Sequence, residues 1–125
     1  MTLQTGLTLT LEKTVAPSDS AKAYGSGMVD VLATPAMIGF MEKTCMELAL
    51  ANLDPGFNTV GTAVDIQHSK ATPIGMKISC TATLLEINGK MLRFSVVVND
   101  EQGRAGDGFH TRAIIDVEKF MAKFK

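Results

Sequence analysis

The stretch Val-Leu-Ala-Thr-Pro-Ala-Met-Ile-Gly-Phe-Met-Glu-Lys-Thr-Cys, residues 31–45, decides the fold that this chain is predicted to adopt. Thr34 is suited to cap a helix, because its hydroxyl can accept a hydrogen bond from a free backbone N–H. Pro35 then falls at the first helical position, where its missing N–H costs nothing. Apolar side chains recur at three- and four-residue spacing as far as Ala51, and turn-forming residues follow at 52–56. The stretch therefore predicts the start of one long helix.

Apolar side chains cover most of the circumference of this predicted helix, so we expect it to be buried. The only other helix candidate is short, and the cover must therefore be a sheet. Glu42 is a carboxylate in this apolar setting, which is costly unless the group is paired or belongs to a site. Two interpretations stay open, because Glu42 can also lie on a narrow polar stripe with Lys43 and Glu47.

Length and composition limit the class of protein. With 125 residues, 46% of them hydrophobic and 20% charged, the chain is expected to be a single domain, residues 1–125, with a sizeable core rather than a disordered segment. The net charge is −1 and no basic cluster occurs, which argues against nucleic acid as a partner. No apolar run reaches 18 residues and no signal peptide is apparent, so neither a membrane span nor export is expected.

The two cysteines, Cys45 and Cys80, fall in the predicted helix and in a predicted strand. Both are interpreted as buried thiols in a reducing cytoplasm. No pair of Cys or His residues has the spacing of metal ligands, so no metal site and no cofactor are expected.

Alternating apolar and polar residues predict five strands, at residues 3–15, 58–69, 76–87, 91–99 and 104–116. Asn88-Gly89 is a strong hairpin signal, and Gly61 inside a strand marks a bulge or a close backbone approach. Residues 22–30 are expected to be a flexible connection. A short C-terminal helix is predicted over residues 117–124, capped by Asp116.

This order of elements predicts an α+β protein of the hotdog type. An apolar helix after the first strand, followed by a meander of four antiparallel strands, implies a curled sheet of about five strands wrapped round that helix. Such a sheet leaves an edge strand and one helix end uncovered, so a homodimer is expected to complete the burial. The sequence leaves open whether dimers pair further into tetramers.

Six residues are candidates for a functional site, and each also has a structural interpretation. His68 points to the apolar side of its strand by alternation from Val64 and Ile66, where a hydrogen-bonded core histidine is the commoner case. His110 is a weaker candidate, and Arg112 on the same strand face is either a surface arginine or an anion clamp. The remaining candidates are Thr34, Glu42 and Gly61.

Geometry restricts how Thr34 and Glu42 can act together. Eight residues of straight helix span about 12 Å, so the two side chains cannot touch if both lie in the helix. They can face one site only if Thr34 is folded back in the entry loop, or if the site combines two subunits.

Several motifs in a fixed order resemble the fluoroacetyl-CoA thioesterase family of hotdog proteins. They are Val-Leu-Ala-Thr-Pro at 31–35, Phe-Met-Glu at 40–42, Gly-Thr-Ala at 61–63, His68 with Ala-Thr-Pro at 71–73, Gly-Phe-His-Thr-Arg at 108–112 and Glu-Lys-Phe at 118–120. The resemblance extends from about Val31 to Lys123.

The resemblance implies an acyl-CoA thioesterase that is a homodimer and uses a Thr-Glu-His catalytic set. Carried over by position, this set is Thr34, Glu42 and His68, and Gly61 and Arg112 contact the acyl thioester or CoA. The chain departs from the family before its helix, where residues 24–28 are short and small. Aromatic residues cover the acyl pocket there in the fluoroacetyl-specific enzyme, so fluoroacetyl specificity is not expected of this chain.

The leading hypothesis is therefore hydrolysis of a small acyl-CoA thioester. In it, Glu42 acts as nucleophile or as general base, His68 transfers protons and Thr34 orients the reacting groups, while a backbone N–H near Gly61 holds the oxyanion. The alternative is a non-catalytic hotdog module that binds acyl groups or only dimerises. A hydratase on the same fold is a third candidate, but its usual helix histidine is missing here.

Overall fold

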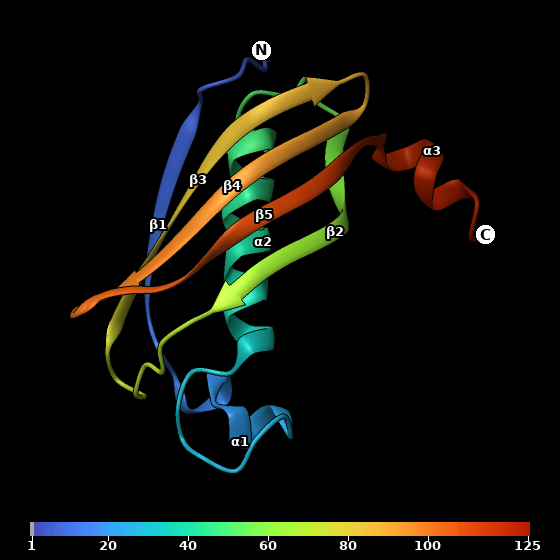
Figure 1. The fold of residues 1–125 in the computed structure, drawn as a ribbon. Coiled ribbons are helices and arrows are strands. Elements are labelled where there is room, and N and C mark those ends of the chain that lie inside the picture. Colours follow the sequence, from blue (N-terminus) through green and yellow to red (C-terminus); the bar gives the residue numbers. More distant parts are fainter. Residues whose placement is uncertain (1) are drawn as a thin grey trace.

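A curled five-stranded antiparallel sheet wraps one long helix in the computed structural model, which describes residues 2–125 (Figure 1). The long helix α2 stands behind the sheet, α1 lies near the end at which α2 begins, and α3 projects from the far end of β5. In chain order, the elements are β1 (Thr8–Thr14), the 3-10 turn Pro17–Asp19, α1 (Ala21–Tyr24), α2 (Thr34–Leu50), β2 (Phe57–His68), β3 (Lys77–Asn88), β4 (Met91–Asp100), β5 (Gly103–Asp116) and α3 (Val117–Ala122).

The strands lie in the order β1-β3-β4-β5-β2, and every neighbouring pair is antiparallel. This confirms the predicted hotdog arrangement. The predicted β3–β4 hairpin also forms, but its two turn residues are Gly89 and Lys90, because Asn88 pairs with Met91. The expected four-strand meander is wrong in one respect, because β2 pairs with β5 and not with β3. Gly106 and Gly108 explain this pairing: a Cβ at either position would collide with the backbone of β2, so only glycine lets the strands approach.

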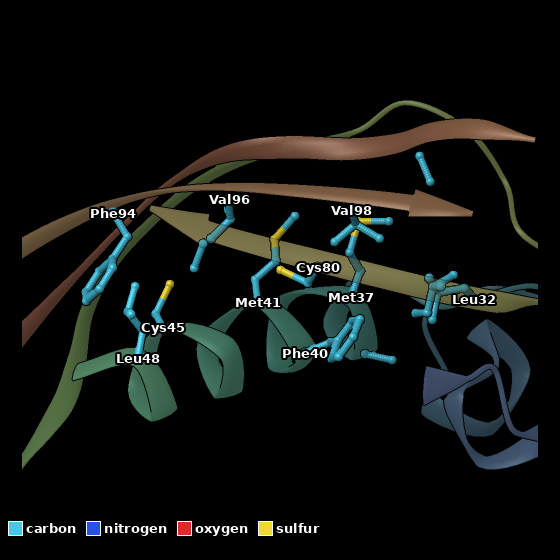
Figure 2. Close-up of a cluster of buried hydrophobic side chains, with 14 of the residues drawn as sticks. Leu32, Met37, Phe40, Met41, Cys45, Leu48, Cys80, Phe94, Val96 and Val98 are labelled. Carbon is cyan, nitrogen blue, oxygen red and sulfur yellow. The ribbon is translucent and has the colours of Figure 1, made fainter. Parts of the chain in front are cut away.

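The core is the layer of side chains between α2 and the sheet (Figure 2). Met37, Met41 and Cys45 extend from the helix toward Val96 and Val98 of β4, and all five are buried. The opposite side of α2 is more open, and Leu50 at its end is 44% exposed. Burial of the helix is therefore one-sided within this chain, whereas the sequence predicted burial nearly all round.

Several predicted boundaries shift. The first strand is shorter than the predicted residues 3–15, and the C-terminal helix ends at Ala122 rather than at residue 124, although Asp116 caps it as expected. The connection at 22–30 contains most of α1, because Ser20 caps that short helix and Gly25, at φ 71°, ends it. Within residues 2–125, no helix combines the length and the hydropathy that a membrane crossing needs.

The start of α2 corrects a prediction about Thr34. The helix cap is Ala33, whose side chain cannot donate or accept, and Thr34 is already the first helical residue with Pro35 next. Thr34 therefore does not cap the helix. Its hydroxyl is free to bond elsewhere, and it is not folded back in the entry loop.

A β-bulge in β2 fixes which side chains face the helix. The β2–β5 register pairs Gly61 with Arg112 and Ala63 with Thr111, so Thr62 is the extra residue. Residues 61 and 68 are seven positions apart and would face opposite sides of a regular strand. The bulge changes the alternation, so that Gly61 and His68 pair with core-facing positions of β5 and share one face. Of the two alternatives predicted for Gly61, a bulge or a close backbone approach, the register shows the bulge.

Candidate functional site

Thr34 and His68 form a pair at the start of α2. The Thr34 hydroxyl lies 2.7 Å from His68 Nδ1, within hydrogen-bond distance. His68 is partly buried at the end of β2, and this burial lowers the pKa of its imidazole, so the ring is predominantly neutral at pH 7. Its Nε2 is buried and makes no hydrogen bond in the described structure. A neutral imidazole with a nitrogen that has no hydrogen-bond partner can accept or donate a proton.

A cavity of about 360 Å³ adjoins this pair. Its walls come from the end of β2, the entry to α2 and the segment near α1. Its lining residues are mostly small: Ala21, Ser26, Val31, Leu32, Ala33, Thr34, His68, Ser69, Lys70 and Ala71. Met28 and Gly25 do not line this cavity, and Met28 is 92% exposed.

Glu42 belongs to a second cluster, two turns along α2. A Cβ built on Gly61 would lie 3.0 Å from Glu42 Oε2, so the missing side chain leaves the room that the carboxylate occupies. Arg112 Nη1 lies 3.9 Å from the same oxygen. The Glu42 side chain is 42% exposed, and one side of the carboxylate thus remains open to solvent or to a ligand. This arrangement places Glu42 beside the Arg112 cation.

Arg112 is buried, with 6% of its surface exposed, so it is not a surface arginine. Its Nε donates to the Thr59 hydroxyl at 2.7 Å, and Nη2 donates to the Thr59 carbonyl at 2.9 Å. Burial lowers the pKa of Arg112, and the charge of Glu42 opposes that shift. Because the side chain is held by these bonds, it presents a fixed guanidinium edge to Glu42.

His110, which ranked as the weakest candidate, is 2% exposed and completes this second cluster. Its Nδ1 lies 2.8 Å from the Ala63 carbonyl and its Nε2 lies 3.1 Å from Arg112 Nη1. Sequence reasoning missed Thr59 altogether and underrated His110. Strand alternation could have indicated them, because residues two positions apart in a strand share one face. His110 and Arg112 are two apart on β5, and Thr59 and Gly61 are two apart on β2.

The five predicted site residues thus divide into two groups along α2. Thr34 and His68 meet at its first residue, while Glu42, Gly61 and Arg112 meet about 12 Å further along the axis. Among the hydrogen bonds and ion pairs of residues 2–125, none joins Glu42 to His68. Within one chain, the Thr34 cluster and the Glu42 cluster are therefore separate, although they lie on the same face of the sheet.

Solved structures place this fold among known proteins. A hot-dog-like protein from Thermanaerovibrio acidaminovorans superposes with a TM-score of 0.87 at 19% identity, over 96% of this chain and 89% of that one. This likeness shows the fold alone. The long helix and the curled sheet wrapped round it define a hotdog protein.

The family follows from closer relatives. The fluoroacetyl-CoA thioesterase of Streptantibioticus cattleyicolor is 38% identical over 96 residues, which cover 77% of this chain and 69% of that protein. A solved fluoroacetyl-CoA thioesterase superposes with a TM-score of 0.90 at 33% identity, over 98% and 95% of the two chains. The model of the family described as fluoroacetyl-CoA-specific thioesterase matches residues 15–118. The chain belongs to this family, and is accordingly a thioester hydrolase.

Proposed function

We propose that this protein, as one hotdog domain, hydrolyses small acyl-CoA thioesters. The observation that carries the proposal is the approach of the Glu42 carboxylate to Gly61, with Arg112 fixed 3.9 Å away. A solved variant of a fluoroacetyl-CoA thioesterase, 32% identical to this chain, is in complex with acetyl-CoA, which supports an acyl-CoA as substrate. The alternative is a non-catalytic acyl-binding or dimerisation module.

In the proposed reaction, an oxygen of Glu42 or of a water molecule attacks the thioester carbon, the C–S bond breaks and CoA leaves as a thiol. If Glu42 attacks, water then hydrolyses the Glu42–acyl anhydride, and in either case the acyl group leaves as a carboxylic acid. Glu42 acts as nucleophile or as general base on water, and His68 transfers the proton that the leaving sulfur takes up. Thr34 holds the His68 ring through its hydroxyl. Backbone N–H groups at the Gly61 bulge stabilise the developing oxyanion, an interaction worth about 3 kcal/mol per donor. Arg112 binds a polar part of the substrate.

The separation of the Thr34–His68 pair from the Glu42 cluster supports a homodimer in which each site combines two protomers. Because Thr34 lies in the helix, it cannot fold back toward Glu42 of its own chain. The edge strand β2 is exposed from Gly61 to Asp65, and Val64 is 44% exposed although it lies opposite the buried His110. Antiparallel pairing of two β2 strands about a two-fold axis would cover this stretch. It would also bring the His68 end of one strand toward the Gly61 end of the other.

The acyl group is proposed to be small but not specifically fluoroacetyl. Tyr24 and Met28 are exposed, and the space above Gly25 is open. Among residues 2–125, no phenylalanine or tyrosine side chain lines the cavity beside Thr34. The free, buried thiols of Cys45 and Cys80 support a reducing compartment such as the cytoplasm.

The substitution Glu42→Gln tests the proposal. Steady-state release of CoA thiol is measured on a panel from acetyl-CoA to long-chain acyl-CoA, with fluoroacetyl-CoA included. We expect kcat on the best substrate to fall by about 100-fold or more, because an amide can neither attack nor accept a proton. Glu47→Gln is the matched control on the same helix, and it should leave kcat within about twofold, as expected for a residue outside the reacting groups.

Two outcomes would contradict this assignment. Unchanged turnover in Glu42→Gln, or an equal loss in Glu47→Gln, would remove Glu42 from the chemistry. A wild-type protein that binds acyl-CoA but turns over no member of the panel would favour the non-catalytic module.

A further inference from the structure

The hydrogen-bond partners of His110 determine where its proton lies. Arg112 Nη1 can only donate, so His110 Nε2, 3.1 Å away, must accept. The Ala63 carbonyl can only accept, so Nδ1, 2.8 Å away, must carry the hydrogen. The imidazole is therefore the neutral Nδ1–H tautomer. No such assignment follows for His68, because its partner Thr34 can donate or accept.

Each of these two bonds fixes a part of the Glu42 cluster. Ala63 is the first paired residue after the bulge, and His110 Cε1 is 3.2 Å from where a Cβ on Gly61 would lie. The Nδ1–H bond thus ties the bulged segment of β2 to β5. On the other side of the ring, Thr59 holds Nε and Nη2 of Arg112, whereas Nη1 bonds His110. Nη1 is also the nitrogen that faces Glu42.

We infer that His110 is a positioning residue: as the neutral Nδ1–H tautomer, it holds the Gly61 bulge and aims Arg112 Nη1 at the Glu42 carboxylate. This inference deepens the proposed function and rests on it where turnover is concerned. His110 is itself almost fully enclosed, so it acts through these neighbours rather than on the substrate.

Protonation of His110 would break the arrangement. A hydrogen on Nε2 would point at the Arg112 guanidinium and remove the acceptor that aims it. The surroundings oppose this: burial lowers the pKa of His110, and the charge of Arg112 lowers it further. The Ala63 carbonyl on β2 and the Glu42 charge from α2 act in the opposite direction but are outweighed, and the β4 residue opposite the ring, Phe94, is uncharged.

Three substitutions of His110 test its two hydrogen bonds separately. His110→Asn places an amide N–H near the Nδ1 position, and His110→Gln places an amide oxygen near the Nε2 position, so each keeps one contact. His110→Phe keeps a ring but neither contact. We expect kcat/KM to fall by about 10- to 100-fold in His110→Phe, as for a small misplacement of catalytic groups, with part of the loss recovered in Asn and Gln. Ile78→Val on β3 is the control for lost core stability.

The tautomer provides a readout that does not depend on turnover. The chain has two histidines, so a ¹H–¹⁵N spectrum of the imidazoles contains two spin systems, and His110→Phe assigns them. We expect His110 to show a protonated Nδ1 and an unprotonated Nε2 at pH 7, and to titrate below its usual pH range.

Results that overturn the inference about His110 differ from results that refute the proposed function. An Nε2–H tautomer or an imidazolium at pH 7 would overturn the inference even in a fully active enzyme. So would a His110→Phe enzyme that loses no more kcat/KM than Ile78→Val. A wild-type protein without thioesterase turnover would refute the proposed function, while the spectrum would still decide whether His110 holds Arg112.

Discussion

Asp100 at the end of β4 provides the most direct test of how the structure supports the site. Its side chain is fully buried and accepts two bonds from Lys70 Nζ, at 2.6 and 2.8 Å, and one from the Thr72 hydroxyl at 2.9 Å. The backbone N–H of Gln102 donates a fourth at 2.7 Å. Lys70 and Thr72 follow His68 closely in the chain. The Asp100 carboxylate therefore ties the segment behind His68 to the β4–β5 turn.

We expect Asp100→Asn to destabilise the protein substantially. Removing one partner of a fully buried ion pair costs about 3–5 kcal/mol, because the remaining charge is left uncompensated. The Lys70 side chain is 35% exposed, so solvent compensates part of its charge and the lower end of this range applies. Asparagine retains one oxygen but turns an NH₂ group toward the ammonium of Lys70, so we expect a loss of about 3 kcal/mol. In urea, where stability falls by about 1–3 kcal/mol per molar, the unfolding midpoint should drop by roughly 1–3 M.

Asp107→Asn is the matched control, since it makes the same change in the neighbouring strand. Asp107 pairs with Arg104 at 3.0 Å, but the two side chains are 42% and 59% exposed. An exposed pair of this kind contributes at most about 1 kcal/mol, and often less. Similar midpoints for the two variants would refute the claim that burial makes the Asp100 pair strong.

The pH dependence of stability provides a second test of the Asp100 ion pair. Burial alone would raise the pKa of Asp100, but the bonds from Lys70, Gln102 and Thr72 outweigh it and lower the pKa. The folded state therefore binds its proton less readily than the unfolded state does. The stabilisation is present above the unfolded pKa of about 3.9 and is lost as the pH falls through the lower folded value. The difference between wild type and Asp100→Asn should shrink below about pH 4.

Two further predictions concern the assembled site and the thiols. If each site combines two protomers, a mixture of Thr34→Val and Glu42→Gln chains should regain about a quarter of wild-type activity once the protomers exchange, although each variant alone is inactive. Half of the dimers are then mixed, and each mixed dimer has one intact site. No recovery despite proven exchange would place both residues in one protomer's site. Burial raises the pKa of both the Cys45 and the Cys80 thiols, so we expect a thiol reagent to label the native protein at pH 8 far more slowly than the urea-unfolded protein; rapid native labelling would contradict the burial of these residues.

The fold could be predicted largely from the sequence because its signals are local. Three- and four-residue spacing indicated α2, alternation indicated the strands, and Asn88-Gly89 indicated the β3–β4 hairpin. These patterns depend on how each residue meets its near neighbours in the chain. The position of β2 beside β5 could not be predicted in the same way, since it depends on a fit between Gly106 and a strand some 40 residues away.

The sequence by itself singled out Thr34, Glu42 and His68 as candidates, although it gave no indication of Thr59. It also excluded direct contact between Thr34 and Glu42 within one helix, since the rise of a helix sets that distance. Only the tertiary structure decided their partners. In the folded protein the Thr34 hydroxyl lies within hydrogen-bond distance of His68 and does not cap the helix, and Arg112 and His110 are buried beside Glu42. The tertiary structure also placed one extra residue, Thr62, so that Gly61 and His68 share a face. Register and bulges arise from pairing between distant strands, and for that reason they are not visible in the local pattern.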